Sequence, residues 1–317
     1  MITLAQARLN VQDDLQIGVI DEFAKSSYIM SHIPFEDVVS PTGGGATLTY
    51  AYTRQITQPT AQFRKVNAEF GTHEVEKQRY TTDLKVFGGA FEVDRIIAGM
   101  GGIVDEVKWQ MEQKIKAASA LFSDTIINGN TSVDEDVFDG LDVALTGSAT
   151  EFNADGEVID LSTSDAVTAN YVAFMDVLDE FLAELDGTPD ALLMNGKMAA
   201  KMRAVARRAG MYQVTKDTFG NQVEHYGNIP FVDLGAKAGS NDPIVGINGG
   251  VTSIYAVRFG KDAFHAISMA GKAPVEVWMP DFSTAGAVKK GEVEMVAGCA
   301  LKTTKSCGVL RKIKVSA

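Results

Sequence analysis

Two segments of the chain alternate hydrophobic and polar residues with a period close to two, and a long polar stretch separates them. The first covers residues 47–54 and the second residues 80–87, and both are rich in β-forming residues. This pattern predicts a two-stranded β-ribbon over residues 46–85, with limbs that advance about 3.3 Å per residue. Because an isolated ribbon of two strands is only marginally stable in water, we expect neighbouring subunits to cover it.

A strong helical period comes next. Apolar residues recur every three to four positions from Ile103 to Ile126, and charged residues occupy the opposite face. Asn128 and Gly129 supply the signal for its C-terminal end. At 1.5 Å per residue the predicted helix is about 35–40 Å long. A helix of this length in a mixed domain is usually a structural strut.

Residues 140–270 have the pattern of a second lobe with α/β character. We expect one helix over residues 171–185, and a basic helix that Asn195 caps and Gly210 closes. The predicted strands of this lobe are short and apolar, and they cover residues 191–194, 229–232, 244–247 and 253–257.

Both ends of the chain are expected to pack on other segments. Residues 1–45 resemble an arm, with a short amphipathic stretch followed by an extended segment that cannot bury its own apolar side chains. After Pro274 the strand pattern returns, and we expect these strands to lie beside the long helix and to rebuild the first lobe as a discontinuous domain. They cover residues 275–279, 292–296, 299–302 and 309–315.

Composition changes this picture mainly through charge. The 317 residues include 29 Lys and Arg against 41 Asp and Glu, a formal net charge of −12. A balance this acidic excludes a broad basic surface that grips nucleic acid. Two cysteines, Cys299 and Cys307, are too few for a disulfide framework. We interpret them as buried thiols of a protein that folds in a reducing cytosol, without a secretory signal or a segment that spans a bilayer.

The search for chemistry in the sequence yields no candidate catalytic, cofactor-binding or metal-binding residue. The glycine-lysine pairs lack the upstream glycine of a phosphate-binding loop, and the four histidines lie far apart. In the acidic loop over residues 134–140 the glycine comes one position late for a calcium-binding loop. The basic helix around Arg203, Arg207 and Arg208 is interpreted as a solvated face or an intersubunit ion-pair surface, in preference to a nucleic-acid contact.

The order of these elements resembles the major capsid proteins of tailed phages, whose Hong Kong 97-type coat fold encapsulin shells share. Residues 126–130 (Ile-Ile-Asn-Gly-Asn) followed by residues 138–141 (Phe-Asp-Gly-Leu) are similar to the family's link between spine helix and axial domain. Residues 191–197 are similar to its strand, asparagine and helix segment. Residues 207–212 and 226–232 resemble the family's stretch with Gly-Arg-Tyr followed by Gly-x-Pro-Val.

This resemblance implies an α+β fold of the Hong Kong 97 type, divided into four parts. These are an N-terminal arm (1–45), an extended β-ribbon loop (46–85), a peripheral domain with a long spine helix (86–140 and 271–317) and an axial domain (141–270). It implies a non-enzymatic capsid protein that assembles in the host bacterial cytoplasm into the icosahedral shell of a virion.

The partners that the resemblance implies are many copies of the chain in pentamers and hexamers, with portal, scaffolding and decoration proteins. The shell would enclose double-stranded DNA without sequence-specific binding and without a membrane. The ribbon would overlap a neighbouring subunit, and its aromatic and basic residues are the candidate interface residues: Tyr50, Tyr52, Arg54, Phe63, Arg64, Lys65, Phe70, Lys77 and Arg79. The alternatives are an encapsulin-like compartment that encloses a cargo enzyme, and a soluble α/β enzyme.

Overall fold

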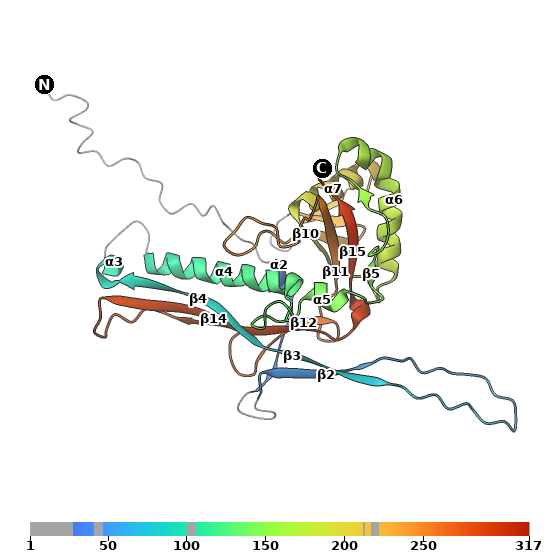
Figure 1. Ribbon diagram of the computed structural model, residues 1–317, viewed down its shortest axis with the longest axis horizontal. Coiled ribbons are helices and arrows are strands. Elements are labelled where there is room, and N and C mark those ends of the chain that lie inside the picture. Colours follow the sequence, from blue (N-terminus) through green and yellow to red (C-terminus); the bar gives the residue numbers. More distant parts are fainter. Residues whose placement is uncertain (1–27, 41–46, 100–105, 212, 217–221, 317) are drawn as a thin grey trace.

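The computed structural model describes residues 28–40, 47–99, 106–211, 213–216 and 222–316. Figure 1 shows two lobes side by side and a long ribbon that projects away from both. The first lobe is an elongated sheet with one long helix along it, and the second is a more rounded sheet with helices packed against it. The first 27 residues, which hold the amphipathic stretch of the predicted arm, lie outside the described residues.

The first lobe is built on a sheet with the strand order β1-β12-β14-β13, in which β4 also pairs with β14. Helix α4 packs against β4 and β14. Two short helices, α2 and α3, complete the lobe. The bounds are α2 Tyr28–His32, β1 Phe35–Val39, β4 Lys85–Asp94, α3 Arg95–Gly99, α4 Glu106–Asn128, β12 Phe264–Met269, β13 Val275–Trp278 and β14 Val288–Leu301.

The described part of the arm packs into this lobe, as expected for a segment that cannot bury its own side chains. Strand β1 pairs in parallel with β12, and Phe35 lies opposite Ala266. Ile29 and Ile33 are buried in the same core as Phe122 of α4. The arm therefore completes the edge of the sheet instead of hanging free between residues 28 and 40.

The second lobe is built on a sheet with the order β5-β15-β11-β7-β10-β9-β8, in which β6 also pairs with β15. Its bounds are α5 Leu141–Leu145, β5 Glu151–Phe152, β6 Ile159–Asp160, α6 Ser164–Ala183, β7 Ala191–Met194, α7 Gly196–Ala209, β8 Gln213–Lys216, β9 Gln222–Tyr226, β10 Ile229–Asp233, β11 Val251–Val257, the 3-10 turn Thr304–Ser306 and β15 Cys307–Lys314.

The central strand β7 explains why its sequence is a continuous apolar run. All four of its residues are fully buried. Leu192 and Met194 face the core beneath α6 and α7, while Ala191 and Leu193 face the core that the second lobe shares with α4 and α5. A strand that is covered on both faces has no polar side to expose, because its side chains alternate between the two faces.

The basic helix α7 has the caps that its sequence predicts. The Asn195 side chain accepts a hydrogen bond from the Met198 amide at 2.9 Å. Gly210 closes the helix in the left-handed region, with φ +72°, where a residue without a Cβ has no steric penalty. Asn195 is itself buried and donates to the Val245 carbonyl and the Thr252 hydroxyl. The cap therefore also joins α7 to the loop before β11.

Two glycines form the junction between the lobes. The amide of Gly140 donates to the carbonyl of Gly129 at 2.8 Å, immediately after α4 ends. A Cβ on Gly129 would lie 2.1 Å from the Phe138 carbonyl oxygen, and one on Gly140 would lie 2.6 Å from the Thr125 carbonyl oxygen. These close backbone approaches require glycine at both positions, which accounts for the two glycines of the motif that begins at Ile126.

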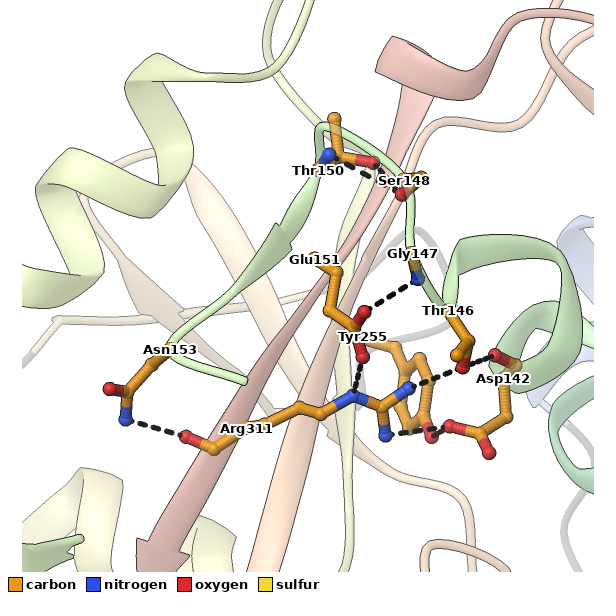
Figure 2. A network of polar contacts seen from close by, with 9 residues as sticks. All are labelled: Asp142, Thr146, Gly147, Ser148, Thr150, Glu151, Asn153, Tyr255 and Arg311. Atoms are coloured by element: carbon orange, nitrogen blue, oxygen red, sulfur yellow. Dashed lines mark hydrogen bonds and ion pairs between the residues drawn. The ribbon is translucent and has the colours of Figure 1, made fainter. Parts of the chain in front are cut away.

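A polar network centred on Arg311 of β15 holds α5 and β5 against the second sheet (Figure 2). The Arg311 guanidinium donates to Asp142 of α5 at 2.8 Å, and also to Glu151 of β5. The Tyr255 hydroxyl donates to the same Asp142 oxygen at 2.8 Å. Burial, together with this carboxylate, raises the pKa of Tyr255 well above its usual value. Because α5 follows the Gly140 junction directly, the network helps to set how the second lobe is joined to α4.

Several elements differ from their predicted bounds. Helix α6 begins at Ser164 and not at residue 171, because Thr163 caps it and its first turns carry polar residues. The predicted strands 292–296 and 299–302 are one continuous strand, β14. Residues 244–247 are not a strand: Ile244 and Val245 are buried in a loop, next to an isolated bridge between Ala236 and Pro243.

The placement of two strands also differs from the prediction. The expectation that all C-terminal strands rebuild the first lobe is wrong for β15, which pairs with β11 in the second sheet. Conversely β12, which was expected in the second lobe, pairs with β14 in the first sheet. The chain crosses between the lobes twice near its end, and local periodicity carries no information on such long-range pairing.

Candidate assembly surfaces

The ribbon projects from the lobes and is largely exposed beyond its paired strands. Strand β2 (Thr49–Gln55) pairs with β3 (Lys77–Asp83) in antiparallel register from Thr49–Asp83 to Gln55–Lys77. Beyond these strands every residue from 58 to 74 is exposed. Figure 1 shows this segment extending far from both lobes. The chain therefore presents a long surface that it does not itself cover.

Apolar side chains stand in the open on this outer segment. Phe63 is fully exposed, and the exposed fractions of Val66 and Phe70 are 89% and 59%. The Arg64 guanidinium lies 5.2 Å from the centre of the Phe70 ring and donates to the Ala68 carbonyl at 3.2 Å. These contacts give the segment a local order around Arg64. Exposed aromatic and apolar groups of this kind are typical of a surface that binds another protein.

The base of the ribbon is held against the first sheet by an aromatic stack. The rings of Tyr50, Tyr52 and Tyr80 follow one another at centroid distances of 5.9 Å, and the Arg54 guanidinium lies 4.2 Å from the Tyr80 ring centre. The Tyr52 hydroxyl donates to the Leu301 carbonyl at 3.0 Å, and Arg54 donates to the same oxygen. Desolvation raises the pKa of Tyr52. The last residue of β14 is thus an anchor for the ribbon.

Four polar residues from different segments meet beside this stack, and we call them the Glu36 cluster: Glu36 of β1, Tyr50 of β2, His265 of β12 and Lys302 after β14. His265 Nε2 and Lys302 Nζ each lie 3.0 Å from Glu36 Oε2. The His265 side chain is fully buried and the Tyr50 ring packs edge-on against it. The cluster joins the arm, the ribbon and the sheet at one point.

Comparison with known proteins gives matches of structure but not of sequence. No protein-family model and no curated protein sequence matches the chain. A solved chain of Mycobacterium phage Adephagia superposes with a TM-score of 0.63 at 15% identity, over 100% of this chain and 99% of that one. The holo-SrpI encapsulin complex of Synechococcus elongatus PCC 7942 gives 0.64 at 14% identity, over 100% and 98%. The capsid of an empty GTA particle gives 0.57 at 13%, over 99% and 98%.

The chain has the Hong Kong 97-type capsid fold. The matches to the Adephagia chain and to the encapsulin each extend over 100% of this chain. The fold class expected from the order of the sequence elements is confirmed. Its division into arm, ribbon, peripheral and axial domains stays a prediction.

The structure separates the nine predicted interface residues into three groups. Tyr50, Tyr52 and Arg54 lie together at the base of the ribbon, where their own chain partly buries them. Phe63, Arg64, Lys65 and Phe70 lie together on the outer segment, and all four are exposed. Lys77 and Arg79 lie on β3 opposite Gln55 and Thr53, and they are exposed as well.

Sequence reasoning missed three members of the Glu36 cluster. Glu36 lies more than 200 residues from His265 and Lys302 in the chain, and no spacing or motif connects the three. They meet because β1 pairs with β12, which a local pattern does not reveal. The nearest signal in the sequence was His265, a single histidine within the buried strand β12.

Among the described residues, no group of three or more His, Cys, Asp or Glu side chains is arranged to hold a metal ion. No described helix is long and apolar enough to cross a membrane. Both cysteines are free and buried, and burial raises the pKa of their thiols, that of Cys307 to about 12. They are therefore protonated and unreactive at neutral pH.

We expect the Glu36 cluster to make stability depend on pH. Burial, and then the Lys302 ammonium, lower the pKa of His265 below its ordinary 6.5. Below about pH 6.5 the unfolded chain therefore binds a proton that the folded chain does not, and stability falls by at most about 1.4 kcal/mol per pH unit from this group. Burial would raise the pKa of Glu36, but the Lys302 ammonium outweighs burial, and the pKa is lowered. The loss of stability that comes from protonating Glu36 therefore occurs only in more acid solution.

The measurement is urea unfolding of the unassembled subunit at pH 7.5 and pH 5.5. The wild-type subunit should lose more stability between the two values than the His265→Gln variant, whose amide does not titrate. His73→Gln is the matched control, since His73 is exposed on the ribbon, and it should behave like the wild type. Equal losses in wild type and His265→Gln would contradict this role for His265.

Proposed function

We propose that the chain is the major subunit of an icosahedral shell, the capsid of a tailed phage that encloses double-stranded DNA. The observation that carries the proposal is the ribbon, whose outer residues 58–74 are exposed although they include Phe63, Val66 and Phe70. A monomeric protein gains nothing from holding such a segment away from its core. The same segment is useful when it lies across a neighbouring copy. Phe63, Arg64, Lys65 and Phe70 would then make the intersubunit contacts.

The proposed division of the subunit follows its two sheets. The first lobe, with α4 as its spine, would be the peripheral domain, and the second lobe would be the axial domain that surrounds the five-fold and six-fold positions. Residues 46–85 would be the extended loop and residues 1–45 the arm. Two strands do not follow these sequence boundaries. Strand β12 lies within residues 141–270 but pairs in the first sheet, and β15 lies within residues 271–317 but pairs in the second sheet.

The net charge of −12 supports a container that encloses DNA without sequence-specific binding. Repeated over many copies, an acidic subunit repels packaged nucleic acid and does not hold it at particular sites. We place the shell in a virion that assembles in the host bacterial cytoplasm, with portal, scaffolding and decoration proteins as further partners and with no enzymatic role.

An encapsulin-like compartment is the second candidate, since the encapsulin match has a TM-score of 0.64, against 0.63 for the phage chain from Adephagia. The contents of particles from the natural source separate the two candidates. We expect particles that protect double-stranded DNA from nuclease and that contain a portal protein. Particles free of DNA and filled with one enzyme would support the compartment instead.

A further inference from the structure

Helices α6 and α7 of the second lobe carry charges of opposite sign. Helix α6 has four acidic side chains and no basic one, whereas α7 has five basic side chains and no acidic one. On α6 we define the acid row as Asp176, Glu180 and Glu184, which follow one another at intervals of four residues and are all exposed. On α7 we define the base row as Lys197, Lys201, Arg207 and Arg208.

The acid row is arranged against local helix energetics. Like charges four residues apart repel each other along the same face. Carboxylates near the C-terminal end of a helix also meet the negative end of its dipole, and Glu184 is the C-cap residue of α6. No Lys, Arg or His of the described residues lies within ion-pair distance of the three carboxylates. A departure from local rules without compensation inside the chain is typical of a functional surface.

No member of the base row makes an ion pair with a described residue either. Lys201 donates to the Ser162 carbonyl at 2.6 Å, and Arg208 donates to the Ser164 and Thr168 hydroxyls. These acceptors are uncharged, so both cations keep their full charge. Lys197 and Arg207 are exposed and make no ion pair with a described residue. Arg203 differs, because it pairs with Glu224 at 2.7 Å.

Two members of the base row, Lys201 and Arg208, lie away from the acid row, near the start of α6. The hydrogen bonds of Lys201 and Arg208 to other segments reach residues 162–168, around the start of α6, whereas the acid row begins at Asp176. Eight residues of helix separate Thr168 from Asp176, about 12 Å at 1.5 Å per residue, which exceeds the screening length of about 10 Å at 0.1 M salt. Figure 1 shows α6 along the outer edge of the lobe, on the side away from α4. An exposed apolar side chain accompanies each row, Val172 on α6 and Met211 just after α7.

We propose that the acid row of one copy binds the base row of the next copy, in a head-to-tail contact that closes rings of the second lobe. This inference rests on the proposed shell function and adds the surface through which the rings close. A second copy is the fitting partner because one chain carries both complementary rows, and a contact between unlike surfaces generates a closed ring when its rotation closes. Exposed apolar groups beside the charges favour a protein partner over solvent or nucleic acid.

Charge reversal tests the contact. The acid-reversed variant carries Asp176→Lys and Glu180→Lys, the base-reversed variant carries Lys197→Glu and Arg207→Glu, and the quadruple variant carries all four. None of these four side chains hydrogen-bonds to another described residue, and Asp179 is left unchanged because it accepts from the Tyr226 hydroxyl. The matched control, Asp155→Lys with Glu157→Lys, makes the same change of charge as the acid-reversed variant, on exposed residues of the same lobe outside both rows.

Particle yield is measured by sedimentation and electron microscopy of the expressed proteins. We expect each reversal alone to lower the yield by about tenfold or more, because repulsion replaces attraction at every ring contact. The control should stay within about twofold of the wild type. The quadruple variant should regain most of the yield, and the two reversed proteins should form mixed particles when they are combined.

Two results would overturn the inference while leaving the shell function intact. The first is that the wild type assembles and the reversed variants assemble as well as the control does. A base-reversed variant that forms normal particles but no longer retains DNA belongs to this first result. The other is a quadruple variant that is no better than the single reversals. A wild type that forms no particles at all would instead contradict the proposed function.

Discussion

Replacing residues 56–76 by an Asn-Gly turn is expected to leave a folded subunit that no longer closes into shells. Gln55 and Lys77 are a directly opposed pair at the ends of β2 and β3. A two-residue Asn-Gly turn joins such a pair with the twist that a hairpin prefers. The variant keeps the aromatic base of the ribbon and removes only the exposed segment with Phe63 and Phe70.

The subunit should tolerate this change because the removed segment contributes nothing to either core. All of residues 58–74 are exposed, so the free energy of unfolding should change by only about 0.5 kcal/mol. Assembly should fail because the segment has no other function in the proposal than contact with a neighbour. Analytical ultracentrifugation should show only monomers or small oligomers where the wild type forms particles.

A flexible segment of equal length separates chain length from side-chain contacts. With residues 56–76 replaced by 21 Gly and Ser residues, the ribbon can still span the same distance, yet it lacks Phe63, Arg64 and Phe70. We expect this variant to fail as the short turn does. Closed particles of normal size from either variant would show that the ribbon is not an assembly element.

Phe122→Ala is expected to lower the free energy of unfolding of the subunit by about 3–5 kcal/mol. Phe122 is fully buried on α4. Its ring contacts Phe35 of β1, Phe87 of β4 and Phe138 of the loop after α4, at centroid distances of 6.0, 5.9 and 6.0 Å. Each aromatic pair adds about 0.5–1.5 kcal/mol beyond the area that it buries. One truncation therefore weakens the contacts of the arm, the sheet and the lobe junction together.

Urea unfolding of the unassembled subunit provides the measurement. Phe122→Leu keeps most of the volume and should lose clearly less stability than Phe122→Ala. Leu121→Ala is the control for helix composition, since Leu121 is exposed on the next position of the same helix, and it should cost about 0.5 kcal/mol or less. If Phe122→Ala loses less than Phe122→Leu, or no more than Leu121→Ala, this account of the core is wrong.

Local patterns in the sequence were enough to locate the ribbon and the main helices. The period-two segments around Tyr50 and Tyr80 pair as expected, since side chains on one face of a strand recur at every second residue. The caps of α7 at Asn195 and Gly210 are equally local, because each depends on backbone groups within four residues. The candidate interface residues of the ribbon came instead from the resemblance to the coat-protein family, which implies that the ribbon overlaps a neighbouring subunit.

Long-range pairing is what the sequence could not reveal. The run Ile244 to Ile247 has the composition of a buried strand, but buried loops and buried strands have the same apolar pattern when they are this short. The sheet to which β15 belongs and the meeting of Glu36 with His265 depend on which strands become neighbours. That choice is made by the packing of the two whole lobes, and no single segment encodes it.

Of the two oppositely charged helices, only the basic helix α7 stood out in the sequence. The base row stood out, and an intersubunit ion-pair surface was among its interpretations. The acid row carries no such signal, because carboxylates at intervals of four residues are common on any exposed helix face. In the proposed shell, the ribbon and the two rows are the surfaces through which each subunit contacts its neighbours.

Electron microscopy of the expressed wild-type chain, combined with sedimentation across micromolar concentrations, tests the central claim most directly. The account predicts closed icosahedral particles or five- and six-membered rings, with the ribbon of each copy lying on its neighbour. A compact monomer that persists at every concentration would contradict it.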